Sequence, residues 1–310
     1  MIEVRNLTKD YGQRRAIESL NFKVEKGEVV GFLGPNGAGK STTMKIITGF
    51  MAPTSGEALV CGYDVFENPM EVKKRIGYLP ETPPVYGDMY VKDYLEFVAQ
   101  LKLVEKHKIS QFVKNAIEKT NLGPVQNRLI QNLSKGFRQR VGIAQALVSD
   151  PEVLILDEPT VGLDPKQVAE IRDLIKELRG QHTIILSTHI LPEVEATCER
   201  IIIINQGKIV AQESLSNIAN ATKNTTRQVS FKVRRNHNEL IQKLLSVTGV
   251  VRAVAGSAPG SVLVELNGSD DAVEMLASTV VQSGAGLIEM QSMAQLEDVF
   301  LKLTYGAAET

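Results

Sequence analysis

One eight-residue segment limits the fold of this chain more than any other feature. It reads Gly34-Pro35-Asn36-Gly37-Ala38-Gly39-Lys40-Ser41 and directly follows the apolar run Val29 to Leu33. The spacing fits G-x-x-x-x-G-K-[ST], in which glycines let backbone N–H groups approach phosphate oxygens. Such a segment needs a buried strand before it and a helix after it, and the sequence supplies both patterns. We therefore predict a phosphate-binding loop in an α/β fold.

The same segment offers side chains for a bound nucleotide. Lys40 supplies a positive charge for the β- and γ-phosphates, and the Ser41 hydroxyl is a hard oxygen ligand for Mg²⁺. Thr42 follows in the first turn of the expected helix, whose N-terminal dipole favours anions. A chance match to the whole pattern is rare, so the sequence predicts that residues 34–42 bind a nucleotide.

A second apolar strand, Val153 to Leu156, ends in two acids, Asp157 and Glu158. The end of such a strand in a parallel sheet lies at the ligand crevice. Because successive side chains of a strand diverge, the two acids can take different roles. We expect Asp157 to bind Mg²⁺, directly or through water, and Glu158 to act as general base on the attacking water. A charged strand end before a proline turn is the simpler alternative, and the phosphate loop makes it the weaker one.

Further segments complete an ordered series of motifs. Leu133 to Arg140 reads LSKGFRQR about twenty residues before Asp157, and Asp157-Glu158-Pro159-Thr160, Gly162-Leu163-Asp164 and His189 follow. In this order, and with the phosphate loop, they resemble the ATP-binding cassette (ABC) family over about residues 2–215. The resemblance implies a P-loop NTPase (RecA-like) core with an antiparallel β subdomain and a helical subdomain at about 84–150. It also implies ATP hydrolysis in a head-to-tail homodimer that buries ATP between two chains.

The resemblance assigns several residues to the nucleotide. Ser134 and Gly136, at the start of an expected helix, would contact the γ-phosphate bound by the other subunit. Asp164 would contact the dimer partner, and His189 would act as a catalytic switch on the γ-phosphate, together with Lys40 and Glu158. Simpler roles are compatible with the same pattern, since Ser134 and Asp164 also suit helix N-caps and a lone histidine is more often structural.

The resemblance also implies which residues lie near the adenine and ribose, and one position departs from the usual family pattern. Tyr11 resembles the aromatic residue that stacks on adenine, with an exposed loop tyrosine as the alternative, and Ala16 would lie near the ribose. Glu81, in the run Ile76 to Glu81, stands where the family usually has a glutamine that reaches Mg²⁺ and the attacking water. Glutamate can also ligate Mg²⁺, so the expected metal ligands are Ser41, Glu81 and Asp157.

The rest of the chain predicts a second, smaller domain. A polar stretch from about Ser214 to Thr226 separates a domain at 1–220 from one at 225–305. The patterns beyond it follow the order strand, helix, strand, strand, helix, strand. That order favours a small C-terminal α+β module of the ferredoxin-like type. We expect a last amphipathic helix over Gln295–Leu303.

Composition limits the partners and the compartment. The only cysteines, Cys61 and Cys198, suit a reducing cytosol and exclude a disulfide scaffold. The apolar runs fall far short of the ~20 residues of a membrane-spanning helix. With 35 basic and 36 acidic side chains, neither domain has the basic surface of a nucleic-acid-binding protein. With the resemblance, these features predict a cytoplasmic ATPase that a separate transmembrane permease holds at the inner face of the cell membrane.

The resemblance is strongest to ATPase subunits of ABC-2-type exporters, including the gliding-motility type. It rests on Leu133–Leu147, on Glu81, and on the run Leu296-Glu297-Asp298-Val299-Phe300 near the end of the chain. The alternative is an ABC ATPase that acts in translation or DNA repair, although such proteins usually carry two cassettes or coiled-coil insertions. An unrelated phosphate-loop enzyme, such as a kinase, would leave the segment Leu133 to Arg140 without a function.

Overall fold

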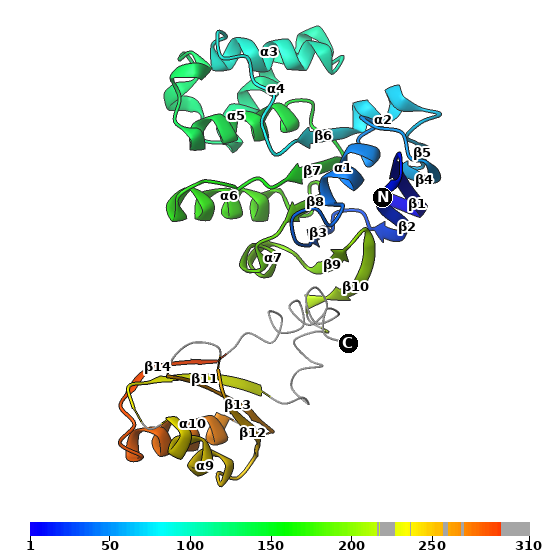
Figure 1. Ribbon diagram of the computed structural model, residues 1–310. Coiled ribbons are helices and arrows are strands. Elements are labelled where there is room, and N and C mark those ends of the chain that lie inside the picture. Colours follow the sequence, from blue (N-terminus) through cyan, green and yellow to red (C-terminus); the bar gives the residue numbers. More distant parts are fainter. Residues whose placement is uncertain (216, 218–226, 236, 257–259, 268–269, 293–310) are drawn as a thin grey trace. The chain divides into compact units, whose positions relative to one another are not determined.

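The fold comes from a computed structural model of the chain (Figure 1). The structure describes residues 1–215, 217, 227–235, 237–256, 260–267 and 270–292. Contacts divide the chain into two compact units, Met1–Leu215 and Ser216–Thr310. The helix expected over Gln295–Leu303 and most of the polar stretch from Ser214 to Thr226 lie outside the described residues.

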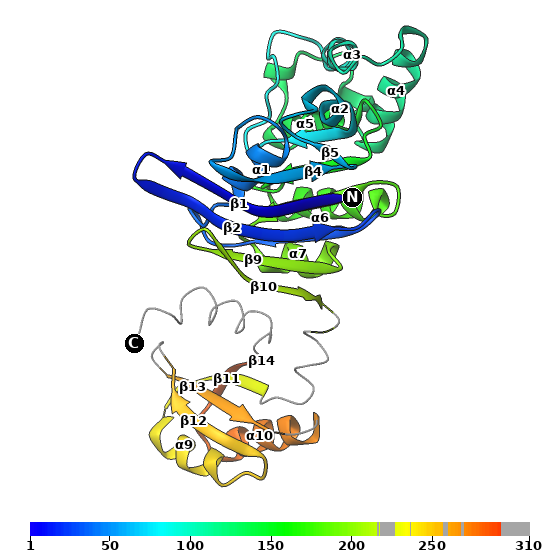
Figure 2. The same cartoon turned by 90° about the vertical axis from the view of Figure 1, so that its right-hand side faces the viewer.

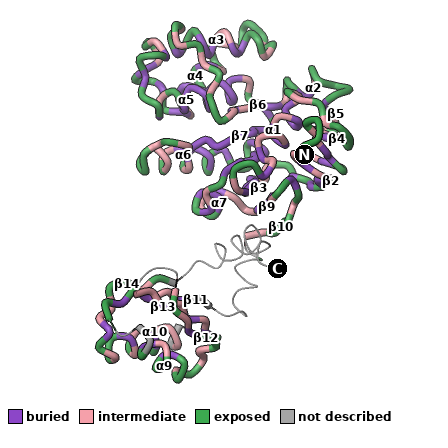
Figure 3. Tube along the Cα trace, in the orientation of Figure 1, coloured by how far each residue is buried: buried purple, intermediate pink, exposed green. Residues whose placement is uncertain are grey.

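A six-stranded sheet forms the centre of the first unit. Its neighbouring strands are parallel, except that the two strands of one edge hairpin are antiparallel. Three of the inner strands are buried along their whole length, as Figure 3 shows, because helices and a second sheet cover both faces. In spatial order the strands are β10 (Lys208–Ser214), β9 (Arg200–Asn205), β3 (Val29–Leu33), β8 (Thr183–Thr188), β7 (Val153–Asp157) and β6 (Ile76–Leu79).

A smaller antiparallel sheet packs beside it, and its two longest strands are prominent in Figure 2. Apolar side chains alternate toward the larger sheet, which is the pattern of a sheet with one buried face. Phe22 and Phe32 join the two sheets, with ring centroids 5.6 Å apart. In spatial order the strands are β2 (Arg14–Val24), β1 (Ile2–Tyr11), β4 (Ser55–Val60) and β5 (Tyr63–Asp64).

Helices complete the first unit in two groups. One group accompanies the sheets and consists of α1 (Lys40–Ile47), α2 (Pro69–Arg75), α6 (Pro165–Leu178) and α7 (Leu191–Thr197). The other group has its own apolar core and consists of α3 (Val91–Leu101), α4 (Lys106–Lys119) and α5 (Lys135–Leu147), with the short 3₁₀ turns η1 (Gly123–Val125) and η2 (Ile130–Asn132). The helical pattern from Val91 to Lys119 is therefore two helices, and Leu103 between them has a left-handed φ of 59°.

The second unit is a four-stranded antiparallel sheet with two helices on one face (Figure 1). Phe231 in the sheet and Leu240 and Leu276 in the helices belong to one buried core. The elements follow the chain order β11 (Arg227–Val233), α9 (His237–Leu245), β12 (Val250–Ala255), β13 (Ser261–Leu266), α10 (Asp270–Gln282) and β14 (Leu287–Ser292), and the strands lie in the order β12-β13-β11-β14.

Within the described ranges, no helix is both long and apolar enough to cross a bilayer.

Candidate nucleotide site

A large cavity opens at the edge of the six-stranded sheet where β3, β7 and β8 end. Its volume is about 810 Å³. It collects residues that are far apart in the sequence, because parallel strands place their carboxyl ends at one edge. The lining residues are Tyr11, Arg14, Arg15, Ala16, Asn36, Gly37, Gly39, Lys40, Ser41, Thr42, Glu81, Glu158, Val161, His189 and Gln206. Most of the residues predicted to bind the nucleotide within one chain therefore meet in this cavity.

The phosphate loop depends on glycine for steric as well as conformational reasons. Gly39 has a φ of 110° at the N-cap of α1, where residues with a side chain are strained. A Cβ atom on Gly34 would lie 2.3 Å from the carbonyl oxygen of Ile204 on β9. The loop is thus pressed against the neighbouring strand, and its backbone is held close to the place where phosphate would bind.

Lys40 lies inside the loop and is only 6% exposed. Its ammonium group donates hydrogen bonds to the carbonyl oxygens of Gly34, at 2.7 Å, and Pro35, at 3.2 Å. The same nitrogen lies 3.4 Å from a carboxylate oxygen of Glu158. These three oxygens hold the positive charge at the centre of the site, where phosphate oxygens can replace them.

Glu158 and His189 form a pair at the ends of adjacent strands. The imidazole Nδ1 lies 2.9 and 3.1 Å from the two carboxylate oxygens of Glu158. Glu158 is 5% exposed and has a left-handed φ of 51°, which is strained for a residue with a side chain. Its backbone N–H donates to the carbonyl of Ser187 on β8 at 2.8 Å. The carboxylate is thus aimed at the cavity, where it can accept a proton from water.

Asp157 lies deeper than Glu158, on the last position of β7, and is 1% exposed. Burial raises the pKa of its carboxyl, the hydroxyls of Ser187 and Ser41 oppose that shift, and the charges of Glu158 and Glu81 add to it. The Oδ1 atom is buried and has no hydrogen-bond partner among the described residues. An acceptor left without a donor beside the Ser41 hydroxyl suits a divalent cation that takes hard oxygen ligands.

The donor set fits Mg²⁺ better than a metal that prefers a cage of protein ligands. Across the described residues, no group of three or more histidine, cysteine, aspartate or glutamate side chains could hold a metal. Magnesium is usually bound by one or two carboxylates together with phosphate oxygens and water. Ser41, Asp157 and the exposed Glu81 offer that kind of incomplete set.

Three predicted nucleotide residues lie elsewhere in the first unit. Ser134 caps α5, with its hydroxyl oxygen accepting from the N–H of Phe137 at 3.4 Å. Asp164 caps α6 in the same way, with its carboxylate accepting from Gln167 at 2.9 Å. A Cβ atom on Gly136 would lie 2.4 Å from the Gln167 side chain, so the two helix starts are in close contact. Neither cap nor Gly136 lines the cavity of its own chain.

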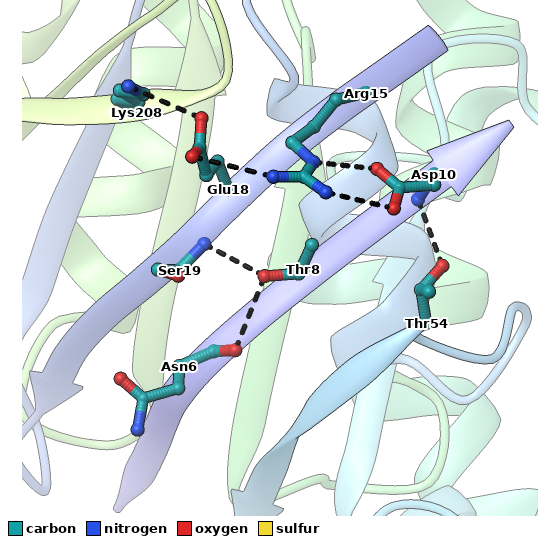
Figure 4. A network of polar contacts seen from close by, with 8 residues as sticks. All are labelled: Asn6, Thr8, Asp10, Arg15, Glu18, Ser19, Thr54 and Lys208. Atoms are coloured by element: carbon teal, nitrogen blue, oxygen red, sulfur yellow. Dashed lines mark hydrogen bonds and ion pairs between the residues drawn. The ribbon is translucent and has the colours of Figure 1, made fainter. Parts of the chain in front are cut away.

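The hairpin between β1 and β2 carries Tyr11 to the rim of the cavity. Figure 4 shows the polar network that holds this hairpin. Arg15 pairs with Asp10 at 2.8 Å and with Glu18 at 3.4 Å, and Glu18 pairs with Lys208 at 3.3 Å. The Tyr11 hydroxyl lies 2.9 Å from the sulfur of Met51, while the residue remains 46% exposed. The ring is therefore fixed at one edge and open to a planar ligand.

Four cavity residues were missed by the sequence analysis: Arg14, Arg15, Val161 and Gln206. Gln206 lies in the turn between β9 and β10 with a φ of 47°, and the N–H of Gly207 donates to the carbonyl of Ala38 at 2.9 Å. A residue pair ending in glycine between two strand patterns is a turn signal. That signal says nothing about the phosphate loop on which the turn packs, because the contact depends on strand order.

Comparisons with known proteins find similar sequences and similar solved structures. A family model described as ABC transporter matches residues 17–161. The uncharacterized ABC transporter ATP-binding protein YxlF of Bacillus subtilis is 31% identical over 98% of this chain and 100% of its own length. The bacitracin transport ATP-binding protein BcrA of Bacillus licheniformis is 38% identical over 68% of this chain and 69% of its own.

Solved structures give the same result for the first unit. The dimeric bacterial ABC transporter cassette MJ0796 superposes with a TM-score of 0.64 at 28% identity, covering 69% of this chain and 99% of that chain. A dimeric post-hydrolysis form of MJ0796, bound to ADP and Pi, gives a TM-score of 0.64 at 26% identity, with the same coverage.

Proposed function

The chain belongs to the ABC transporter ATP-binding proteins and is an ATPase, and from this premise we propose that it energises an exporter whose permease is a separate chain. The observation that carries the proposal is the meeting of the phosphate loop, Glu158 and His189 in one cavity. The named relatives are transport proteins, which gives no support to a role in translation or DNA repair. The transport of bacitracin is a property of BcrA, and it favours export here.

The mechanism follows from the position of each side chain. Lys40 would exchange the carbonyls of Gly34 and Pro35 for the β- and γ-phosphate oxygens. Glu158 would accept the proton of the attacking water, while His189 holds that carboxylate in place and reaches the γ-phosphate. Ser41, Asp157 and Glu81 would hold Mg²⁺, which would supply positive charge against the charge that develops on the phosphate oxygens. Catalysis is therefore mostly positioning and charge stabilisation.

Ser134, Gly136 and Asp164 are proposed to serve the nucleotide of a second copy. Ser134 and Asp164 are exposed caps at helix N-termini, which favour anions, and all three lie outside the cavity of their own chain. A head-to-tail homodimer would give each nucleotide a phosphate loop from one chain and a capped helix from the other. The dimeric form of the cassette MJ0796 supports the formation of a dimer.

A second cavity is proposed as the contact with the permease. It has a volume of about 370 Å³ and lies between α2 and α3. Its apolar side chains are unusually open, with Leu101 63% and Met70 56% exposed, and Lys73 and Lys74 stand at its edge. Exposed apolar surface with a polar rim is typical of an interaction site. A helix end with apolar residues and an acid would suit it, and would hold the protein at the inner face of the membrane.

Lys102, in the wall of this cavity, is hydrogen-bonded to the backbone of α2 and β6. Its ammonium group donates to the carbonyl of Ile76 at 2.8 Å and to that of Lys73 at 3.1 Å. Burial lowers the pKa of this lysine. The end of α3 is thereby joined to the end of α2. A displacement of α3 would therefore be transmitted to β6 and to the segment that carries Glu81.

The second unit is proposed as a ferredoxin-like accessory domain. The order β11-α9-β12-β13-α10-β14 and the strand arrangement β12-β13-β11-β14 match the split βαβ pattern. YxlF matches this chain over 100% of its own length, which includes this domain. Together with Glu81, these features favour an exporter of the ABC-2 type, including the gliding-motility type.

Co-purification from native membranes tests the transport role. We expect the tagged chain to capture a protein with several membrane spans, and Leu101→Glu in the second cavity to reduce that capture at least about tenfold. Val281→Glu is the matched control, because Val281 is also 63% exposed but lies in the second unit. Capture of ribosomes alone, or full capture by Leu101→Glu, would contradict the assignment.

A further inference from the structure

A buried carboxylate lies behind the pair formed by Glu158 and His189. Glu193, in the first turn of α7, is 2% exposed. One of its oxygens accepts a hydrogen bond from the Thr188 hydroxyl at 2.9 Å, and the other accepts from the Thr160 hydroxyl. No lysine, arginine or histidine forms an ion pair with it in the described part of the chain. Burying a carboxylate without a cation is costly, so its two hydroxyl partners need a functional explanation.

The two threonines lie next to the catalytic pair in the sequence. Thr160 lies two residues after Glu158, and Thr188 directly precedes His189. Thr188 also touches the phosphate loop, because its carbonyl accepts from the N–H of Gly34 at 3.4 Å. Its hydroxyl oxygen accepts from the N–H of Ile190 at 3.1 Å. One carboxylate therefore joins the loop after β7 to the end of β8 and, through Thr188, to the loop after β3.

The loop after β7 contains a strained backbone position that such a connection can stabilise. Glu158 is held with a left-handed φ of 51°, and a strained backbone of this kind persists only where its surroundings enforce it. On one side, the N–H of Glu158 is bonded to Ser187. On the other side, the bond from Thr160 to Glu193 closes the loop. Loss of that bond would let the loop relax and would turn the Glu158 carboxylate away from its working position.

We propose that Glu193 is a positioning residue for ATP hydrolysis, which fixes Glu158 and His189 relative to the phosphate loop by binding Thr160 and Thr188. The inference rests on the proposed function of the site. Glu193 does not line the cavity, and its carboxylate accepts hydrogen bonds from the two threonines, so it acts through them. A carboxylate suits this task because its two oxygens can accept from two hydroxyls at once. An amide keeps one acceptor and can donate to the second hydroxyl, whereas an apolar side chain does neither.

The test compares Glu193→Leu and Glu193→Gln in the full-length chain, with kcat and KM for ATP as readouts. We expect Glu193→Leu to lower kcat by about 10- to 100-fold, since small displacements of catalytic groups cost that much, and to change KM by less than about threefold. Glu193→Gln should recover most of the lost kcat. Glu195→Gln, an exposed position on the same helix, is the control and should match the wild type.

A double-mutant cycle with Thr160→Val separates positioning from general instability. If Glu193 acts through Thr160, the double variant should lose little more kcat than Glu193→Leu alone, because partners in one network are not additive. If Glu193→Leu does not fold, Thr160→Val decides the question by the same split between kcat and KM. Unchanged kcat in Glu193→Leu or Thr160→Val, or fully additive losses in the double variant, would overturn the inference. The proposed function would still stand in that case, provided that the wild type turns over ATP. Absence of ATP turnover in the wild type would instead overturn the function.

Discussion

We expect Gly39→Ala to destabilise the first unit far more than Gly37→Ala does. At Gly39 the backbone φ is 110°, outside the region that alanine tolerates, which costs about 1–3 kcal/mol. The new Cβ would lie 2.6 Å from the Ile17 Cγ2 atom and 2.9 Å from the Ala16 carbonyl oxygen. Crowding of this kind adds about 1–3 kcal/mol. The sum is about 2–6 kcal/mol, a large part of a typical stability of about 5–15 kcal/mol.

Gly37→Ala provides the matched control in the same loop. Gly37 has a φ of 80°, but a Cβ there would meet nothing within 4 Å, so only a backbone cost of about 1–2 kcal/mol applies. In calorimetry, the unfolding transition whose Tm rises when ATP is added is that of the first unit. For a unit of this size, a stability loss of 1 kcal/mol lowers the Tm by about 2–4 °C. We expect Gly39→Ala to lower that Tm by roughly 4–24 °C and Gly37→Ala by clearly less. Equal shifts for the two variants would refute the steric reasoning.

Three further changes test other parts of the account. Lys40→Ala should weaken binding of a fluorescent ATP analogue at least about tenfold, because it removes a charge-assisted contact to phosphate; an unchanged dissociation constant would count against its role. Tyr11→Ala should weaken the same binding by about 1–3 kcal/mol while Tyr11→Phe keeps it, since stacking needs the ring and not the hydroxyl; equal losses would argue against stacking. Burial lowers the pKa of the His182 imidazole below its usual 6.5. As the pH drops below about 6.5, the unfolded chain therefore takes up a proton at this side chain before the folded chain does, and the free energy of unfolding falls. In His182→Asn, the free energy of unfolding from urea titrations should fall less steeply as the pH drops below about 6.5. The same pH dependence as in the wild type would contradict this.

Much of the site was predictable because its signals are local. The apolar strand Val153–Leu156 and the acids after it were expected, and β7 ends at Asp157 as the pattern indicates. Ser134 and Asp164 were expected as possible caps, and both side chains accept a backbone hydrogen bond at a helix start. Each of these features needs only a few neighbouring residues, so composition and spacing are sufficient to find them.

What the sequence could not show depends on strand order and on short elements. The helix α7 has only seven residues, too few for a helical period, so Glu193 was not singled out. Its importance comes from Thr160 and Thr188, which meet it only because β7 and β8 are neighbours. The turn at Gln206 reaches the phosphate loop for a similar reason, since β9 lies beside β3.

The same limit applies to short elements with weak patterns. The helix α2 and the strand β6 are short, and β10 is partly exposed along its length. None of them shows a long apolar period, so none was predicted. They form only because tertiary packing stabilises them, which overrides a weak local preference.

ATP turnover by the purified chain and by its Glu158→Gln variant is the decisive measurement for the catalytic site. We expect the wild type to hydrolyse ATP. We expect Glu158→Gln to lose about 10²- to 10⁴-fold in kcat, the usual contribution of a general base, while ATP still binds and dimers accumulate. Turnover at the wild-type rate in Glu158→Gln would contradict the role given to this carboxylate and with it the mechanism of the site.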